Sequence, residues 1–241
     1  MEARAPVQQL RQLLAERLPR VRTGFAVKPP SAVVPTGVRR LDVALGGGLP
    51  LGETTELVSE GLGSGSAQVI HAVVRRNAAD GRFVALVDGA DSLDVDALEP
   101  GDLGRLLWVR CRTVTEALAA TDLLLRDRNF PLVVLDLKLN SATEWRRVSG
   151  SVWHRFHRLR EHHRTTLLVL TARPTVGGVA RRLRVSTGGS RRLGAEATGH
   201  SPAEVLDSLD FEILREMGGR GEGNVAAALD GAAGDRLPLL G

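Results

Sequence analysis

Short apolar runs alternate with amphipathic stretches through the middle of this chain. The runs that polar or turn residues bound most clearly are Thr55–Val58, Phe83–Asp88, Leu106–Val109, Leu132–Asp136 and Thr165–Thr171. Near-continuous apolar runs of this length are typical of strands buried on both faces of a parallel sheet. Between them lie stretches with helical spacing of the apolar residues, such as Ser66–Asn77. The alternation predicts an α/β core, a mostly parallel sheet with helices on both faces.

An amphipathic helix is expected ahead of this core, over residues 6–20. Its apolar positions recur at helical spacing and form one stripe: Val7, Leu10, Leu14 and Leu18. Prolines then mark a linker. We therefore divide the chain into an N-terminal helix with its linker (1–28), a core (29–217) and a glycine-rich tail expected to be flexible (218–241). The stripe is a candidate partner-binding surface, and packing on its own core is the alternative.

Residues 143–164 are predicted to form one basic amphipathic helix. Trp145 and Phe156 belong to its apolar stripe, and arginines lie outside the stripe. His154, His157 and Glu161 share one face, but no second segment offers ligands, so we predict no metal site. The basic face is either a solvated surface or a contact for DNA or an acidic partner.

The next basic segment, 173–192, is expected to be a flexible loop because it contains four glycines. Its six arginines are the candidate DNA-binding residues: Arg173, Arg181, Arg182, Arg184, Arg191 and Arg192. Guanidinium groups suit phosphates, and no aromatic residue in the segment could stack on bases, so contact with DNA would be independent of sequence. A connector without a ligand is the alternative. A short helix from Pro202 and a strand around Phe211 and Ile213 are expected to follow.

The amino-acid composition limits the classes of protein to which this chain can belong. The chain is 43% hydrophobic and 25% charged, with a net charge of +4. Of its 32 basic residues, thirty are arginine and two are lysine. No apolar run is long enough to span a membrane, and no signal-peptide core is present, so we expect a cytoplasmic protein without membrane partners. Cys111 is the single cysteine and is expected to be a core residue.

A glycine-rich turn joins the first buried strand to the first helix of the core. Its shape predicts a phosphate-binding loop, in which backbone N–H groups and a helix N-terminus surround an anion. Such loops end in Gly-Lys-Ser/Thr, where the lysine neutralises the phosphates and the hydroxyl holds Mg²⁺. The residues of this degenerate nucleotide loop are Gly61, Gly63, Ser64, Gly65, Ser66 and Ala67.

Neither alignment of this loop with the motif supplies a cation. Gly65 is followed by Ser66 and Ala67, and a shift by one residue places Gly65 itself at the lysine position. The two lysines, Lys28 and Lys138, lie far away in the sequence. The loop is therefore expected to keep its shape and to lack its charge. We expect no bound cofactor, and weak nucleotide binding by the loop amides is the alternative.

The chain resembles the RecA family from about residue 36 to 175, and more weakly to about 217. The run-in to the loop carries the family's motifs in order: Thr36-Gly37, Leu41-Asp42, Ala44-Leu45-Gly46 and Gly48-Leu49-Pro50. The run that ends at Asp136 is similar to a Walker B strand. By this resemblance, Ala90 stands where the family has the glutamate that activates water, and Asp91 lies one residue further on. Ala172 stands where the family has a glutamine that senses the γ-phosphate.

Within the family, the chain looks most like the ImuA group, which supports translesion DNA synthesis after damage in the SOS response. The resemblance implies a cytoplasmic, nucleoid-associated adaptor and pseudo-ATPase. Its implied partners are an ImuB-like inactive polymerase homologue and an error-prone replicative-type polymerase, with RecA, DNA and self-association as further options. Two alternatives remain open. One is a DNA-dependent RecA- or RadA-like ATPase that takes its cation from elsewhere, and the other is a regulator that binds RecA filaments.

Overall fold

A computed structural model describes residues 32–61, 63–187 and 202–216 of the 241-residue chain. All of them belong to one compact unit of the chain. The predicted N-terminal helix, with its candidate partner residues Val7, Leu10, Leu14 and Leu18, lies outside the described residues, and so does the 218–241 tail. The division at 28 and 217 therefore stays a prediction.

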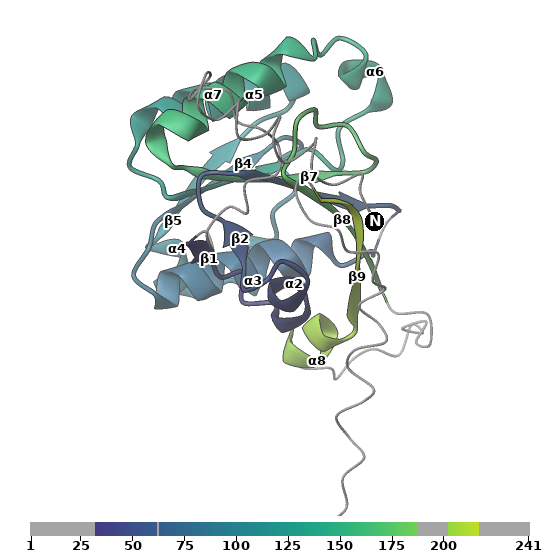
Figure 1. Cartoon of the computed structure of the whole chain (residues 1–241). Helices are drawn as coiled ribbons and strands as arrows, with labels where there is room; N and C mark the ends of the chain where they lie inside the picture. Colours follow the sequence, from purple (N-terminus) through teal and green to yellow (C-terminus); the bar gives the residue numbers. More distant parts are fainter. Residues whose placement is uncertain (1–31, 62, 188–201, 217–241) are drawn as a thin grey trace, which may run out of the picture. The chain divides into compact units, whose positions relative to one another are not determined.

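The core is a seven-stranded sheet (Figure 1). The strands follow the order β5 (Leu106–Arg110), β4 (Val84–Asp88), β6 (Leu132–Asp136), β7 (Thr166–Thr171), β3 (Thr54–Ser59), β8 (Arg181–Thr187) and β9 (Leu209–Glu216). Every neighbouring pair is parallel except β8 and β9, which are antiparallel. A short antiparallel ladder of β1 (Val33–Val34) and β2 (Leu49–Pro50) stands apart. The predicted α/β architecture is confirmed.

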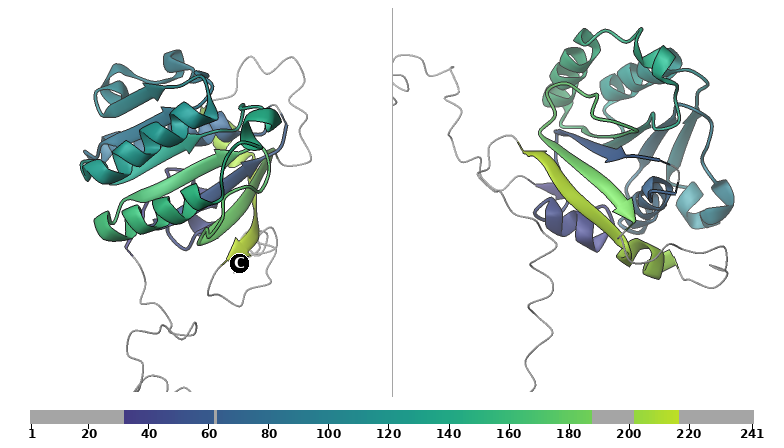
Figure 2. Two further views of the ribbon diagram at one scale, coloured as in Figure 1. Left: turned by 90° about the horizontal axis from the view of Figure 1, so that it is seen from above. Right: turned by 90° about the vertical axis from the view of Figure 1, so that its right-hand side faces the viewer.

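Helices cover both faces of the sheet, as the two views of Figure 2 show. One face carries α5 (Val114–Asp127), α6 (Ala142–Trp145) and α7 (Ser151–His163). The other carries α2 (Arg39–Ala44), α3 (Ser66–Ala79), α4 (Pro100–Leu103), α8 (Pro202–Asp207) and the 3₁₀ turn η1 (Val95–Ala97). No helix among the described residues is long and apolar enough to cross a membrane.

Side chains of each central strand alternate between two hydrophobic clusters. Leu57 and Leu86 point to the α3 side, whereas Val87 and Val133 point to the α5 and α7 side. Burial of both faces explains why these strands are apolar throughout. Cys111 is buried in the second cluster, as expected, and burial raises the pKa of its thiol.

Two local predictions are wrong. The expected single helix over 143–164 is two helices, because a capping box at Ser141 starts α6 and a turn through Gly150 separates it from α7. The expected flexible loop over 173–192 contains a regular strand, β8, over Arg181–Thr187. This strand forms because its backbone pairs with β3 on one side and β9 on the other.

Candidate functional site

The glycine-rich loop lies at the carboxyl end of β3 and leads directly into α3. Gly61, Gly63 and Gly65 all have positive φ angles, of 76°, 73° and 91°. Gly65 is the N-cap of α3, and no side chain caps this helix end. The Ser64 hydroxyl contacts the Ser59 hydroxyl and donates to the Gly61 carbonyl at 3.0 Å. The predicted strand, loop and helix are therefore present.

Gly65 is also required for packing. A Cβ atom at this position would clash with the side chain of Leu209, which β9 places over the loop. Leu209 is fully buried. Two requirements therefore favour glycine at position 65: the close packing of Leu209 from β9 and the space that a bound phosphate would need.

The loop does receive a cation, which corrects the expectation that it lacks one. The ammonium nitrogen Nζ of Lys138 lies 2.9 Å from Ser64 Oγ and 3.0 Å from Ser66 Oγ. Lys138 follows β6 by two residues, and β7 separates β6 from β3 in the sheet. Because the carboxyl ends of parallel strands share one edge, the side chain reaches the loop from another strand. Both serines are buried, and Lys138 is half-buried.

Asp136, the Walker B-like residue, ends β6 beside this lysine. Its Oδ1 accepts the backbone N–H of Lys138 at 3.0 Å. Desolvation is the largest influence on this carboxyl and raises its pKa to about 6, with the nearby Asp88 carboxylate adding to the rise. Desolvation also lowers the pKa of Lys138, against the opposing attraction of Asp136. Both charges are held where water stabilises them poorly, as is common at functional sites.

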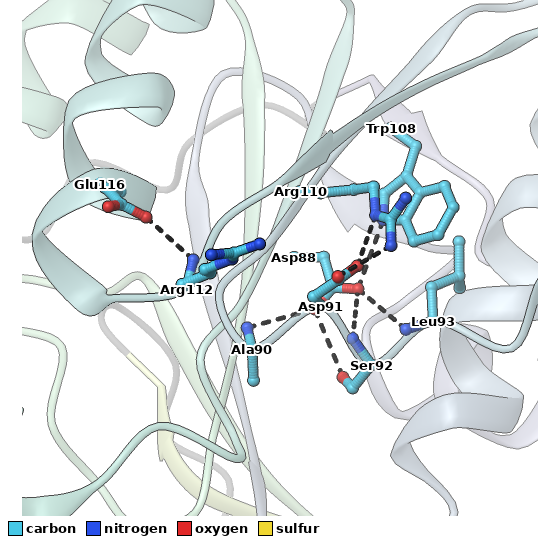
Figure 3. A network of polar contacts seen from close by, with 9 residues as sticks. All are labelled: Asp88, Ala90, Asp91, Ser92, Leu93, Trp108, Arg110, Arg112 and Glu116. Atoms are coloured by element: carbon cyan, nitrogen blue, oxygen red, sulfur yellow. Dashed lines mark hydrogen bonds and ion pairs between the residues drawn. The ribbon is translucent and has the colours of Figure 1, made fainter.

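Asp88 ends β4 and accepts hydrogen bonds from five groups (Figure 3). The donors are the backbone N–H groups of Ala90, Ser92 and Leu93, the Ser92 hydroxyl and Trp108 Nε1. The shortest of these bonds, from the Ser92 N–H, measures 2.7 Å. Asp88 is only 2% exposed. The carboxylate therefore fixes the loop that follows β4.

The same loop contains Ala90 and Asp91, at and next to the position where the RecA family has its water-activating glutamate. Ala90 has no acidic side chain, and its N–H group points to Asp88 (Figure 3). Asp91 has a φ of 53° and is paired with Arg110 of β5 through two contacts of 2.6 and 2.8 Å. Arg110 holds the pKa of Asp91 below its usual range. Its carboxylate is thus occupied at the edge of the sheet.

The end of β7 carries Thr171 and Ala172, where the RecA family has a glutamine that senses the γ-phosphate. Thr171, the last residue of the strand, donates its hydroxyl to Glu56 at 2.9 Å. Ala172 follows, exposed and apolar. Among the described residues, the last residues of β4 and β7 thus make structural contacts, Asp88 with the loop that follows it and Thr171 with Glu56.

Three of the candidate DNA-binding arginines are held in ion pairs within the sheet. Arg182 pairs with Glu56 at 2.5 Å, and Glu56 is fully buried in β3. Arg181 pairs with Glu216, and Arg184 with Glu212 and Glu60. The expectation that these three lie on a flexible loop is wrong, since β8 orders them. Arg191 and Arg192 lie outside the described residues.

Arg173 is exposed, and no ion pair occupies its side chain within the described ranges. It lies two residues before Thr175, whose hydroxyl donates to its carbonyl at 2.7 Å. Thr175 and Gly177 line a hollow of about 400 Å³ together with Trp145, Trp153 and His154. The two tryptophan rings stack with their centroids 6.4 Å apart. The fold thus brings aromatic rings to the segment that lacks them in sequence.

Sequence reasoning missed three groups: Lys138, Glu56 and Trp153. Lys138 has a usable signal, because two residues after a Walker B-like aspartate is a position that faces the same edge as the loop. Glu56 is a single acid within an apolar strand, which points to a buried partner. Trp153 falls on the buried face of α7 once the break at Gly150 is known.

Comparisons with known proteins agree with this geometry. The chain is 39% identical over 119 residues to protein RecA of Mycolicibacterium gilvum, which covers 48% of this chain and 34% of the relative. RecA proteins of Rhodococcus jostii and Kineococcus radiotolerans are 38% and 37% identical over 119 residues. The chain thus spans about one third of the length of the curated relatives it matches. No family model matches.

Among solved structures, the RadB recombinase superposes with a TM-score of 0.50 at 20% identity, over 64% of this chain and 83% of that one. The fold is RecA-like. The RecA-like core accounts for the parallel sheet, the loop after β3 and the acidic end of β6.

Proposed function

We propose that this protein is a non-catalytic RecA-like adaptor in the bacterial DNA damage response, and specifically in translesion DNA synthesis. The observation that carries the proposal is that the chain keeps a RecA-like core, while the ends of β4 and β7 lack the catalytic groups of the RecA family. Ala90 and Ala172 stand at the two positions where hydrolysis needs a base and a γ-phosphate sensor. Each missing group would cost several kcal/mol of transition-state stabilisation in such an enzyme, about 3 kcal/mol for a single donor.

The role of the sheet is then to present surfaces. An ImuB-like polymerase homologue and an error-prone replicative-type polymerase are the proposed partners, and the stripe of Val7, Leu10 and Leu14 is the proposed contact. The support is the resemblance to RecA proteins together with the absence of catalytic groups at the described strand ends. These partners follow from the resemblance to the ImuA group.

The deciding experiment measures ATP binding and hydrolysis by the full chain, with and without single-stranded DNA, alongside pull-down of an ImuB-like partner. Capture of the partner without turnover supports the adaptor. Turnover that DNA stimulates would replace it with the second candidate, a DNA-dependent ATPase. Capture of RecA filaments but not of the polymerase homologue would favour the regulator.

One specific observation from the fold favours the ATPase candidate. The Lys138 ammonium lies within hydrogen-bond distance of two loop hydroxyls, so a cation need not come from a neighbouring subunit. It still lacks a base, because Asp91 is paired with Arg110. A Lys138→Met variant separates the adaptor from the ATPase. ATP turnover that is measurable in wild type and absent in the variant would assign catalysis to this site.

Contact with DNA is proposed at the hollow that Trp145 and Trp153 help to line, in place of the arginines of β8. Arg173 lies two residues before the lining residue Thr175, Arg147 is the neighbour of the lining residue Val148, and both arginines are exposed. An aromatic ring such as that of the partly exposed Trp145 can stack on a base while guanidinium groups contact phosphates. We expect Arg147→Ala with Arg173→Ala to weaken binding of single-stranded DNA and to flatten its salt dependence. Arg184→Ala, which removes a paired arginine, is the matched control.

A further inference from the structure

The cluster around Lys138 has the composition of a cation site. Ser64 and Ser66 present hydroxyl oxygens to Nζ, and Asp136 lies beside the lysine as an anionic neighbour. Oxygen atoms of hydroxyls and carboxylates are the ligands that hard cations such as Mg²⁺ prefer. In phosphate-binding loops of this kind, the metal is held between a loop serine or threonine and the Walker B aspartate. Ser66 and Asp136 are the corresponding residues here.

The residues do not fit a metal-bound nucleotide in addition to this lysine. Two of the three ammonium N–H donors are directed at Ser64 and Ser66, and the backbone N–H of Lys138 is directed at Asp136. A divalent ion bound to Ser66 would meet the ammonium group that already lies 3.0 Å from the Ser66 hydroxyl. Two positive charges at so short a distance repel each other strongly, even near a protein surface.

We propose that the Lys138 ammonium is a tethered cation that takes the place of a divalent metal between the loop serines and Asp136. The loop then keeps its conformation without metal or nucleotide. The inference rests on the proposed function, because an adaptor gains a surface that does not switch between nucleotide states. It goes further by naming the residue that replaces the ligand.

Mn²⁺ is the probe for a metal held by Ser66 and Asp136. Wild-type protein is expected to bind Mn²⁺ weakly by electron paramagnetic resonance. Lys138→Met removes the charge and keeps much of the side-chain volume, so its Mn²⁺ affinity is expected to rise by about tenfold or more. The added substitution Asp136→Asn should abolish that gain, because it removes the carboxylate ligand. Lys138→Arg, which keeps the charge, is the matched control and should stay weak.

A second measurement uses wild-type protein and a Ser66→Ala variant, and it does not depend on the folding of any Lys138 variant. The chain contains only two lysines, so acylation with a small amine reagent can be followed at Lys138 with Lys28 as the reference peptide. Addition of Mn²⁺ should leave the acylation rate of Lys138 unchanged. In Ser66→Ala, one acceptor is lost, and the rate at Lys138 should increase several-fold relative to Lys28.

The outcomes separate clearly. Unchanged Mn²⁺ affinity in Lys138→Met overturns the assignment, as does tight Mn²⁺ binding by wild type that protects Lys138. Binding of ATP by wild type that Lys138→Met destroys also overturns it, because the lysine would then be a phosphate ligand. Failure to capture a polymerase partner would remove the proposed function and leave the cation assignment standing.

Discussion

Asp88 and Asp136 are paired residues at the ends of the adjacent strands β4 and β6, yet their surroundings differ. Asp88 accepts hydrogen bonds from five donors and fixes the loop from Ala90 to Leu93. Asp136 accepts one, from the N–H of Lys138, and its pKa is raised to about 6. The Asp88 carboxylate is satisfied by its five donors and holds the fold. The Asp136 carboxylate has one donor and remains available for a cation, and this difference locates the site.

The strongest test of this comparison is the removal of the Asp88 carboxylate. In Asp88→Ala, the N–H groups of Ser92 and Leu93 and the Trp108 indole lose their acceptor in a buried place. We expect the free energy of unfolding to fall by about 3 kcal/mol. Urea denaturation followed by tryptophan fluorescence measures it.

Ser92→Ala removes one of the five contacts and is the graded control. Its loss should be well below that of Asp88→Ala. Equal losses in the two variants would mean that Ser92, and not the shared acceptor, holds the loop.

The loop on the other side of the comparison depends on packing. Gly65→Ala forces a side chain into the φ of 91° and against Leu209. We expect it to lower the free energy of unfolding by about 2–3 kcal/mol, measured by chemical denaturation.

Gly61→Ala is the matched control, because Gly61 also has a positive φ but nothing lies within 4 Å of an added Cβ. The difference between the two variants, about 1–2 kcal/mol, reports the packing of Leu209 alone. A Gly61→Ala loss as large as that of Gly65→Ala would assign the cost to backbone strain.

The raised pKa of Asp136 predicts a pH-dependent effect of Asp136→Asn. The pKa is about 6 in the folded protein against 3.8 for an ordinary aspartate. The folded state therefore binds the proton more tightly, so wild type has this stabilisation at low pH and loses it as pH rises through about 6. The asparagine has no such dependence. Relative to wild type, the variant should gain about 1 kcal/mol between about pH 5 and pH 7.5.

Thermal unfolding at the two pH values measures that gain. Asp127→Asn, at an exposed end of α5, is the control for a general charge effect. A stability difference between Asp136→Asn and wild type that does not change with pH would show that Asp136 is not held in the desolvated state that the comparison assigns to it.

The smallest effect is expected at Asp91, the acid nearest to the catalytic position of the family. Asp91→Asn removes an exposed pair with Arg110, and such pairs contribute little. We expect the unfolding midpoint to remain near that of wild type and ATP turnover to be unaffected. A specific loss of turnover in this variant would give Asp91 a role as base and contradict the comparison.

Much of the fold follows from local patterns. The runs at Leu132–Asp136 and Thr166–Thr171 predict β6 and β7 closely, because strands buried on both faces have few polar residues. The run at 143–164 misleads, because its apolar spacing passes through Gly150 without interruption. The arginines of β8 mislead for a related reason: charge suggests a solvated loop, but Arg182 has a buried partner, Glu56, that lies 126 positions away in the chain.

The sequence by itself determined the α/β alternation and the glycine-rich loop, because each is a property of residues that are close in the chain. Tertiary structure alone decided where the loop obtains its cation. Lys138 is 74 positions from Ser64 and 72 from Ser66, and only the parallel order of β3, β7 and β6 brings their ends to one edge. Short-range patterns specify elements, whereas the meeting of charges across a sheet depends on strand order.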